Sequence, residues 1–218
     1  MDPGYSVASK HVVYEFGNEF FAYWDDGDDI EDDYGDNDVY VFKEKITYLE
    51  CGVALFRSQF GSVFGMGGDD VGYFDFFVDM SLLYEVARYV KDVFFYSETD
   101  ASVCPFILRM PDCDVTIENC AKAMNMHPNL VDNLTDAYSQ YEHNVLNIDD
   151  FDPDNSTDEE KEKQQIFLDD WMNKYAPNFV SFYPVKNDVI LNPFPLVFLG
   201  RRKGSENVIG FISAYVWT

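Results

Sequence analysis

Alternation of apolar and polar positions marks both ends of the chain as β-structure. Residues 11–24, HVVYEFGNEFFAYW, mix β-branched and aromatic side chains and predict one strand or a bent pair of strands. Strand character resumes over 38–60, where Gly52 is the expected break between two strands. After Pro177 the segments NFVSFYPV, FPLVFLGRR and NVIGFISAYVW also predict strands, and RRKGSEN predicts a hairpin turn between the last two.

The middle of the chain begins with a glycine-rich stretch, GSVFGMGGDDVG at 61–72, which predicts a turn. The aromatic run YFDFFVD at 73–79 then predicts a short strand. Over 80–94 we expect a helix, with Ser81 as a candidate cap, because positions 83, 86, 87 and 90 are apolar at helical spacing. The stretch around VCPFILRM is expected to be irregular.

Three later segments predict helices. Thr116 is a candidate cap for the first, and Pro128 is well placed to open a second that continues through Leu134 to Val145. Ser156 with Glu159, and Thr157 with Glu160, match the capping box ahead of a third. The expected apolar faces of the first and third helices are Ile117, Cys120, Ala121 and Met124, and Phe167, Leu168, Trp171, Met172 and Tyr175.

The order of strands, helices and strands predicts a single α+β domain over 1–218, with a mixed or antiparallel sheet built from both ends. Residues 1–78 are expected to be mainly strands around an acidic loop at 25–38. Residues 79–176 are expected to be mainly helical with an acidic linker at 147–160, and 177–218 to form the C-terminal strands.

Composition shows that the acidic residues belong to a folded chain. The 218 residues are 47% hydrophobic and 17% aromatic, whereas disordered acidic chains are poor in such residues. Forty acidic residues against 15 basic ones give a formal charge of −25. This balance argues against direct binding to nucleic acid or to an anionic membrane. A basic protein partner would offset the self-repulsion, while solubility or a salt-adapted cytoplasm are simpler explanations.

The sequence favours a cytoplasmic location. Residues 1–14 lack the charged and apolar regions of a signal peptide. The apolar stretch at 208–217 is about half as long as a membrane span. Four cysteines without framework spacing predict free thiols in a reducing compartment.

Negative charge is concentrated in two runs. WDDGDDIEDDYGDND at 24–38 holds nine carboxylates after Trp24, and no Lys or Arg occurs between Lys10 and Lys43. Strand-like segments flank this run, so we expect a long loop between two strands of one sheet. The second run, NIDDFDPDNSTDEE, covers 147–160.

Metal and cofactor sites are not expected. Asp150, Asp152 and Asp154 match the start of an EF-hand loop, but Asn155 replaces the glycine and Lys161 replaces the final glutamate. A zinc set could be written as Cys104, Cys113, Cys120 and His127, but no CxxC pair occurs.

Known catalytic patterns are also absent. The glycine-rich stretch lacks the Lys and Ser/Thr of a P-loop, and Asp69 and Asp70 would repel a phosphate. Neither GxSxG nor HExxH accompanies the three histidines, His11, His127 and His143. An enzyme with an unrecognised carboxylate or histidine site stays open as an alternative, as does an acidic structural protein.

The charge pattern itself suggests a mimic of nucleic acid. Side chains at i and i+2 of an extended segment lie about 7 Å apart, comparable to the spacing of phosphates along a strand. Aromatic neighbours would add anchor contacts. Small, acidic, aromatic-rich α+β proteins of this kind resemble bacterial immunity proteins and phage anti-defence inhibitors, some of which mimic DNA.

That resemblance implies stoichiometric inhibition of a basic toxin or defence enzyme that handles nucleic acid, without catalysis by the chain itself. The expected partner-binding residues are Trp24, Asp25, Asp26, Asp28, Asp29, Glu31, Asp32, Asp33, Tyr34, Asp36, Asp38, Asp69, Asp70, Asp149, Asp150, Asp152 and Asp154.

Overall fold

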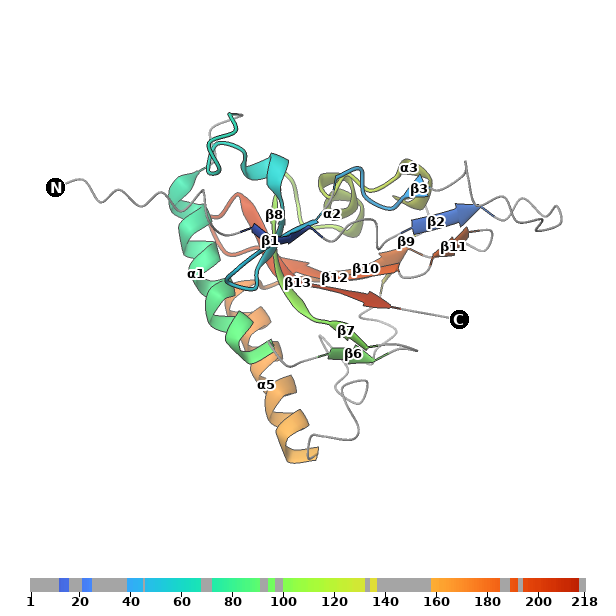
Figure 1. The fold of residues 1–218 in the computed structure, drawn as a ribbon. Coiled ribbons are helices and arrows are strands. Elements are labelled where there is room, and N and C mark those ends of the chain that lie inside the picture. Colours follow the sequence, from blue (N-terminus) through green and yellow to red (C-terminus); the bar gives the residue numbers. More distant parts are fainter. Residues whose placement is uncertain are drawn as a thin grey trace.

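An eight-stranded mixed sheet forms the centre of the protein (Figure 1). The computed structural model describes residues 12–15, 21–24, 39–44, 46–67, 72–90, 94–96, 100–131, 134–136, 158–184, 189–191 and 194–215. In spatial order the strands are β1 (Val12–Glu15), β4 (Ile46–Leu49), β5 (Ala54–Phe56), β8 (Cys104–Arg109), β13 (Asn207–Tyr215), β12 (Phe194–Gly200), β10 (Val180–Pro184) and β9 (Leu134–Asp136). Among the described strands, β5 and β8 are the only pair that runs parallel. The α+β class with a mixed sheet is therefore confirmed.

Two smaller sheets accompany the large one. The first has the order β11 (Val189–Leu191), β2 (Phe21–Trp24) and β3 (Val39–Tyr40), and all its pairs are antiparallel. The second pairs β6 (Phe94–Tyr96) with β7 (Asp100–Ser102). The segment 11–24 thus forms two strands in different sheets, and β11 was not expected from the sequence.

Helices cover both faces of the large sheet (Figure 1). The long helices α1 (Tyr73–Val90) and α5 (Asp158–Tyr175) lie on one face. Trp171 of α5 packs against Phe211 of β13, with ring centroids 5.5 Å apart. The short helices α2 (Ile117–Ala123) and α3 (Pro128–Val131) lie on the other face, and a 3-10 turn, η1 (Arg57–Phe60), follows β5.

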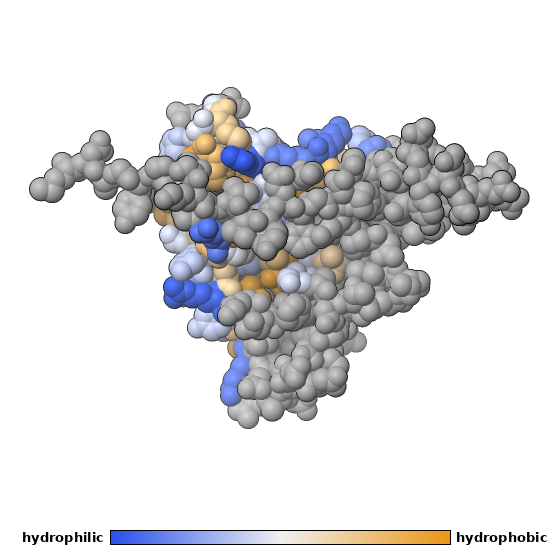
Figure 2. All heavy atoms as spheres, viewed as in Figure 1, coloured by the Kyte–Doolittle hydropathy of each residue, from blue (hydrophilic) through white to orange (hydrophobic). Residues whose placement is uncertain are grey.

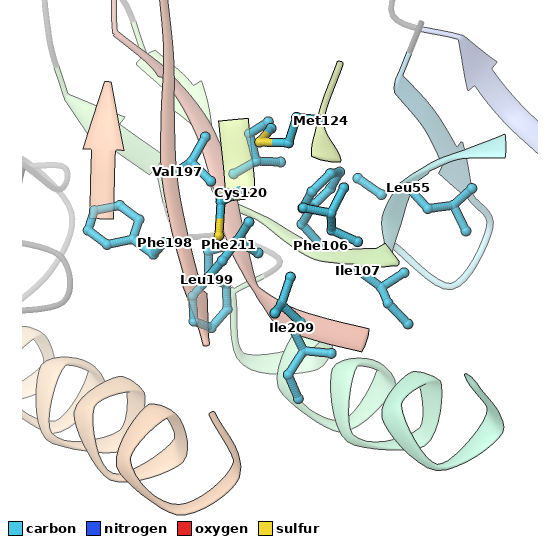
Figure 3. Packing of buried hydrophobic residues seen from close by; sticks show 14 of the residues in the cluster. Leu55, Phe106, Ile107, Cys120, Met124, Val197, Phe198, Leu199, Ile209 and Phe211 are labelled. Carbon is cyan, nitrogen blue, oxygen red and sulfur yellow. The ribbon is translucent and has the colours of Figure 1, made fainter. Parts of the chain in front are cut away.

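The core is a continuous set of apolar side chains on both sides of the central strands. Ile209 points toward α1, whereas Phe106 and Met124 lie on the opposite side of the strands (Figure 3). Phe106 makes an edge-to-face contact with Phe56 at 5.6 Å. Since side chains alternate across a strand, neighbouring residues of β8 and β13 serve the two halves of the core.

Several elements follow the expected sequence signals. Gly52 separates β4 from β5 with a φ of 82°, a conformation that glycine adopts at little cost. The side chain of Thr116 caps α2 by accepting a hydrogen bond from the backbone N–H of Asn119. The hairpin between β12 and β13 and the helix after the capping-box motifs are also confirmed.

Three sequence interpretations were wrong. Residues 73–79 are the first two turns of α1, so Ser81 lies inside the helix, where its hydroxyl donates to the carbonyl of Phe77. The stretch expected to be irregular contains β8, a central strand, in spite of Pro105. The helix that Pro128 opens ends at Val131, and Leu134 begins β9. The segment 79–176 therefore contains strands as well as helices.

Candidate functional site: a partner-binding surface

The first acidic run joins two strands that pair with each other. Phe21 of β2 lies opposite Tyr40 of β3, and Ala22 lies opposite Val39. Partners across an antiparallel pair have Cα atoms roughly 5 Å apart. The strands on either side of 25–38 therefore pair in one sheet, as expected, while the loop expected at 25–38 itself lies outside the described residues.

One of the expected partner-binding residues, Trp24, lies in the described part of the chain. Trp24 is the last residue of β2, where it pairs with Val189 of β11. The other expected residues lie outside the described parts of the chain; these are Asp25, Asp26, Asp28, Asp29, Glu31, Asp32, Asp33, Tyr34, Asp36, Asp38, Asp69, Asp70, Asp149, Asp150, Asp152 and Asp154.

Several basic side chains of the described chain have partners within the protein itself. Arg202 binds Asp75 and Asp79, and Arg109 lies 3.9 Å from Glu206. The Arg88 guanidinium lies over the ring of Tyr84, and the Lys174 ammonium lies over that of Tyr175. Arg202 and Arg109 are therefore paired with carboxylates of the chain itself, whereas Arg88 and Lys174 contact neutral rings.

Asp79 is the most deeply buried carboxylate of the described chain, with 0% of the residue exposed. It lies on the inner face of α1, and its Oδ2 accepts hydrogen bonds from Ser205 Oγ at 2.6 Å and Asn207 Nδ2 at 3.0 Å. Its Oδ1 accepts one from Arg202 Nε at 2.6 Å. Since both oxygens of Asp79 accept hydrogen bonds and the residue is closed to solvent, this carboxylate is not accessible to a substrate.

The Asp79 cluster instead joins α1 to the β12–β13 hairpin. Arg202 also donates to Asp75 Oδ1 at 2.8 Å, so one guanidinium spans two acids on successive turns of α1. Burial lowers the pKa of Arg202. The hydrogen bonds that Arg202 donates to Asp79 and Asp75, together with the negative charges of these carboxylates, outweigh this effect, so the pKa is raised. In the sequence, the signal for this cluster is an aspartate at a core position of α1, within the segment 73–79 for which the sequence predicts a strand.

The cysteines do not form a metal site. Cys104 lies in β8 and Cys120 is buried in α2, whereas Cys113 is exposed in the connection between them. Burial raises the pKa of Cys104 to about 11 and that of Cys120 to about 12. Within the described residues, no group of three or more His, Cys, Asp or Glu side chains could hold a metal ion.

The outer face of α1 carries an unusual number of exposed rings. Phe74 is 79% exposed, Phe77 is 47%, and Tyr73 and Tyr84 are each 45%. On a helix these positions form one continuous strip, together with Ser81, Glu85 and Arg88. We call these seven residues the α1 strip. Contiguous exposed apolar surface of this kind is typical of protein–protein contacts.

The α1 strip continues onto the turn at 61–67. The Tyr73 hydroxyl donates to the carbonyl oxygen of Ser62 at 3.1 Å, which holds the turn against the start of the helix. Met66 in this turn is half exposed. Hydrophobic residues gather over this region of the surface, at the upper left of Figure 2.

Comparison with known proteins gives no family for the chain. No protein-family model matches it, and no curated protein matches it either. In the part of the chain that the structure describes, no helix is both long and apolar enough to cross a lipid bilayer.

Proposed function

We propose that this protein is an acidic inhibitor that occupies the positively charged groove of a basic, nucleic-acid-processing enzyme such as a toxin or a defence nuclease. The observation that carries the proposal is the position of the acidic run. The segment between Trp24 and Val39, which carries nine carboxylates, connects two strands that pair directly. A run held at both ends loses less conformational freedom on binding than a free tail does.

Charge supports a basic target. The formal charge of −25 gives the protein a long-range attraction for cationic surfaces, which speeds encounter with them. The same charge repels nucleic acid. We therefore expect the inhibitor and the nucleic acid to compete for one groove of the enzyme, and not to bind the enzyme together in a ternary complex.

Aromatic residues beside the acids support a defined contact. Trp24 ends β2 immediately before the run, and Tyr40 in β3 lies opposite Phe21 on the partner strand. Large rings next to charged segments supply buried anchors in protein interfaces, while the charges set the orientation.

Affinity capture tests this function. The tagged full-length chain would be immobilised in cell extract at low salt and eluted with a salt gradient. A basic nuclease or DNA-binding protein should elute at moderate salt, since screening weakens charge-driven contacts.

The captured protein should then lose activity in proportion to the amount of inhibitor added, and duplex DNA should compete with the inhibitor for it. Capture of a protein whose activity and DNA binding are unaffected would contradict the proposal. So would the absence of any partner that responds to salt.

A further inference from the structure

We propose that two copies of this chain associate through the α1 strip, with the two α1 helices antiparallel about a twofold axis at Ser81. The strip is the outer face of a helix whose inner face is fixed on the sheet by Leu83, Val86 and Val90, which are almost fully buried. The exposed rings of the strip therefore lie on a helix that is held in place by core packing. This contact goes beyond the proposed inhibitory function and uses a different surface.

The spacing of residues in the strip suits a second copy. Phe74 and Arg88 each lie seven positions from Ser81, on opposite sides of it. An antiparallel twofold arrangement thus places Phe74 of one copy next to Arg88 of the other, which favours a cation–π contact. The small side chain of Ser81 lets the helices approach closely at the axis.

Charge also favours a second copy of the chain as the partner of the α1 strip. Glu85 and Arg88 are the ionisable groups of opposite sign on the strip, so its formal charge is zero. Two molecules that each carry −25 repel at their acidic surfaces, and a neutral strip is where they can meet at least cost. A basic partner would be drawn to the acidic runs instead.

The exposed area of the α1 strip is large enough for a dimer interface. The four rings together expose roughly 400 Å², given about 200 Å² for a whole aromatic side chain. Met66 and the polar members of the strip raise this to roughly 700 Å² per copy, close to the ~800 Å² per partner of a standard interface.

Sedimentation of the full-length chain over about 1–100 µM tests the proposal. We expect a monomer–dimer equilibrium that tightens as salt rises from about 50 to about 500 mM, because salt screens repulsion between the copies. Phe77→Glu should weaken the dimer by roughly tenfold or more, since the axis at Ser81 sets position 77 of one copy opposite Glu85 of the other and the substitution brings two carboxylates together. Ile166→Glu is the control, because Ile166 is 53% exposed on α5, outside the strip.

Cross-linking gives a second readout. Ser81→Cys, with the exposed Cys113 changed to Ser, should form a disulfide between copies under mild oxidation. The unmodified protein, whose exposed Cys113 is not part of the strip, should cross-link far more slowly. A protein that stays monomeric at high salt would overturn the proposal. So would a dimer that is left unchanged by both Phe77→Glu and Phe74→Lys, which places a second cation next to Arg88 of the other copy, when circular dichroism shows that both variants are folded.

Discussion

Arg202 in the β12–β13 hairpin donates a 2.6 Å hydrogen bond from Nε to Oδ1 of Asp79, a fully buried residue in the middle of α1. The two residues are 123 positions apart in sequence. Ser205 and Asn207 from the same hairpin complete the environment of the carboxylate. This cluster fixes the helix that carries the α1 strip to the centre of the sheet.

Loss of the Asp79 charge should destabilise the protein severely. Asp79→Asn removes the charge that compensates Arg202 and replaces an acceptor with a donor that faces the donors of Ser205 and Asn207. Breaking a buried pair in this way costs about 3–5 kcal/mol of the free energy of unfolding. Urea denaturation followed by circular dichroism measures the loss.

Asp75→Asn is the matched control for that measurement. Its side chain is 25% exposed and makes one contact with the same guanidinium, so we expect a loss of about 1 kcal/mol or less. Equal losses for the two variants would show that burial of Asp79 does not determine its contribution.

An alanine at Gly200 should disturb the end of α5. A Cβ at this position would overlap the carbonyl group of Ala176, at 2.8 Å from its carbon atom. The backbone must shift to accept it, and such overpacking costs about 1–3 kcal/mol. Gly72→Ala is the control, because its Cβ would meet nothing closer than Asp75 Oδ2 at 3.8 Å. Thermal unfolding of the two variants should therefore differ clearly, and similar midpoints would contradict the steric argument.

Buried thiols should weaken the fold at alkaline pH. In the folded protein, burial raises the pKa of Cys104 to about 11 and of Cys120 to about 12, against 9.0 for an unperturbed thiol. Between these values the folded state binds more protons than the unfolded state, so stability falls as pH rises. The contribution is complete below pH 9.0 and is lost as pH approaches the folded pKa values.

Urea midpoints measured at intervals from pH 8 to 11 in wild type and Cys120→Ala would isolate this effect, with a shallower decline expected in the variant. At neutral pH a thiol reagent should react rapidly with the exposed Cys113 and only on unfolding with Cys120. Parallel declines in the two proteins would exclude Cys120 as a source of the pH dependence.

Neutralising part of the acidic run should slow association with a basic target. The variant Asp28→Asn, Asp29→Asn, Asp32→Asn, Asp33→Asn should lower the association rate about tenfold at low salt and flatten its salt dependence. Stopped-flow or surface plasmon resonance measurements of binding to the captured target would give both quantities.

The control removes four charges elsewhere. Asp112→Asn, Asp114→Asn, Glu118→Gln, Asp170→Asn changes exposed residues of the described chain by the same total charge. Equal effects from the two variants would mean that net charge acts without a specific acidic surface. Unchanged kinetics in the first variant would exclude the run at 25–38 as the interface.

The sequence predicted elements where local signals agree. β-branched and aromatic residues with a central turn defined the β12–β13 hairpin, and flanking strands placed the acidic run between β2 and β3. β8 was missed because Pro105 interrupts its pattern, although the strand is central in the sheet. There the tertiary environment overrides a local preference.

The sequence did not predict the α1 strip or the Asp79 cluster, because residues 73–79 were expected to form a strand and not the start of α1. Aromatic residues at 73–77 favour a strand by propensity, but Phe76 and Asp79 face inward at helical spacing while Phe74 and Phe77 face outward. The role of a buried aspartate such as Asp79 cannot be predicted without its hydrogen-bond donors. These donors come from a hairpin more than a hundred residues away, which no local pattern reveals.

The pairing of β2 with β3 also sets a minimum width for any groove that receives the acidic run. Strands in a sheet lie about 4.8 Å apart, so the outgoing and returning chain segments start side by side. A cleft that admits one extended strand is too narrow at its mouth for both. If the run binds its target as we propose, we expect that target to be an enzyme whose channel accommodates a duplex rather than one that threads a single strand.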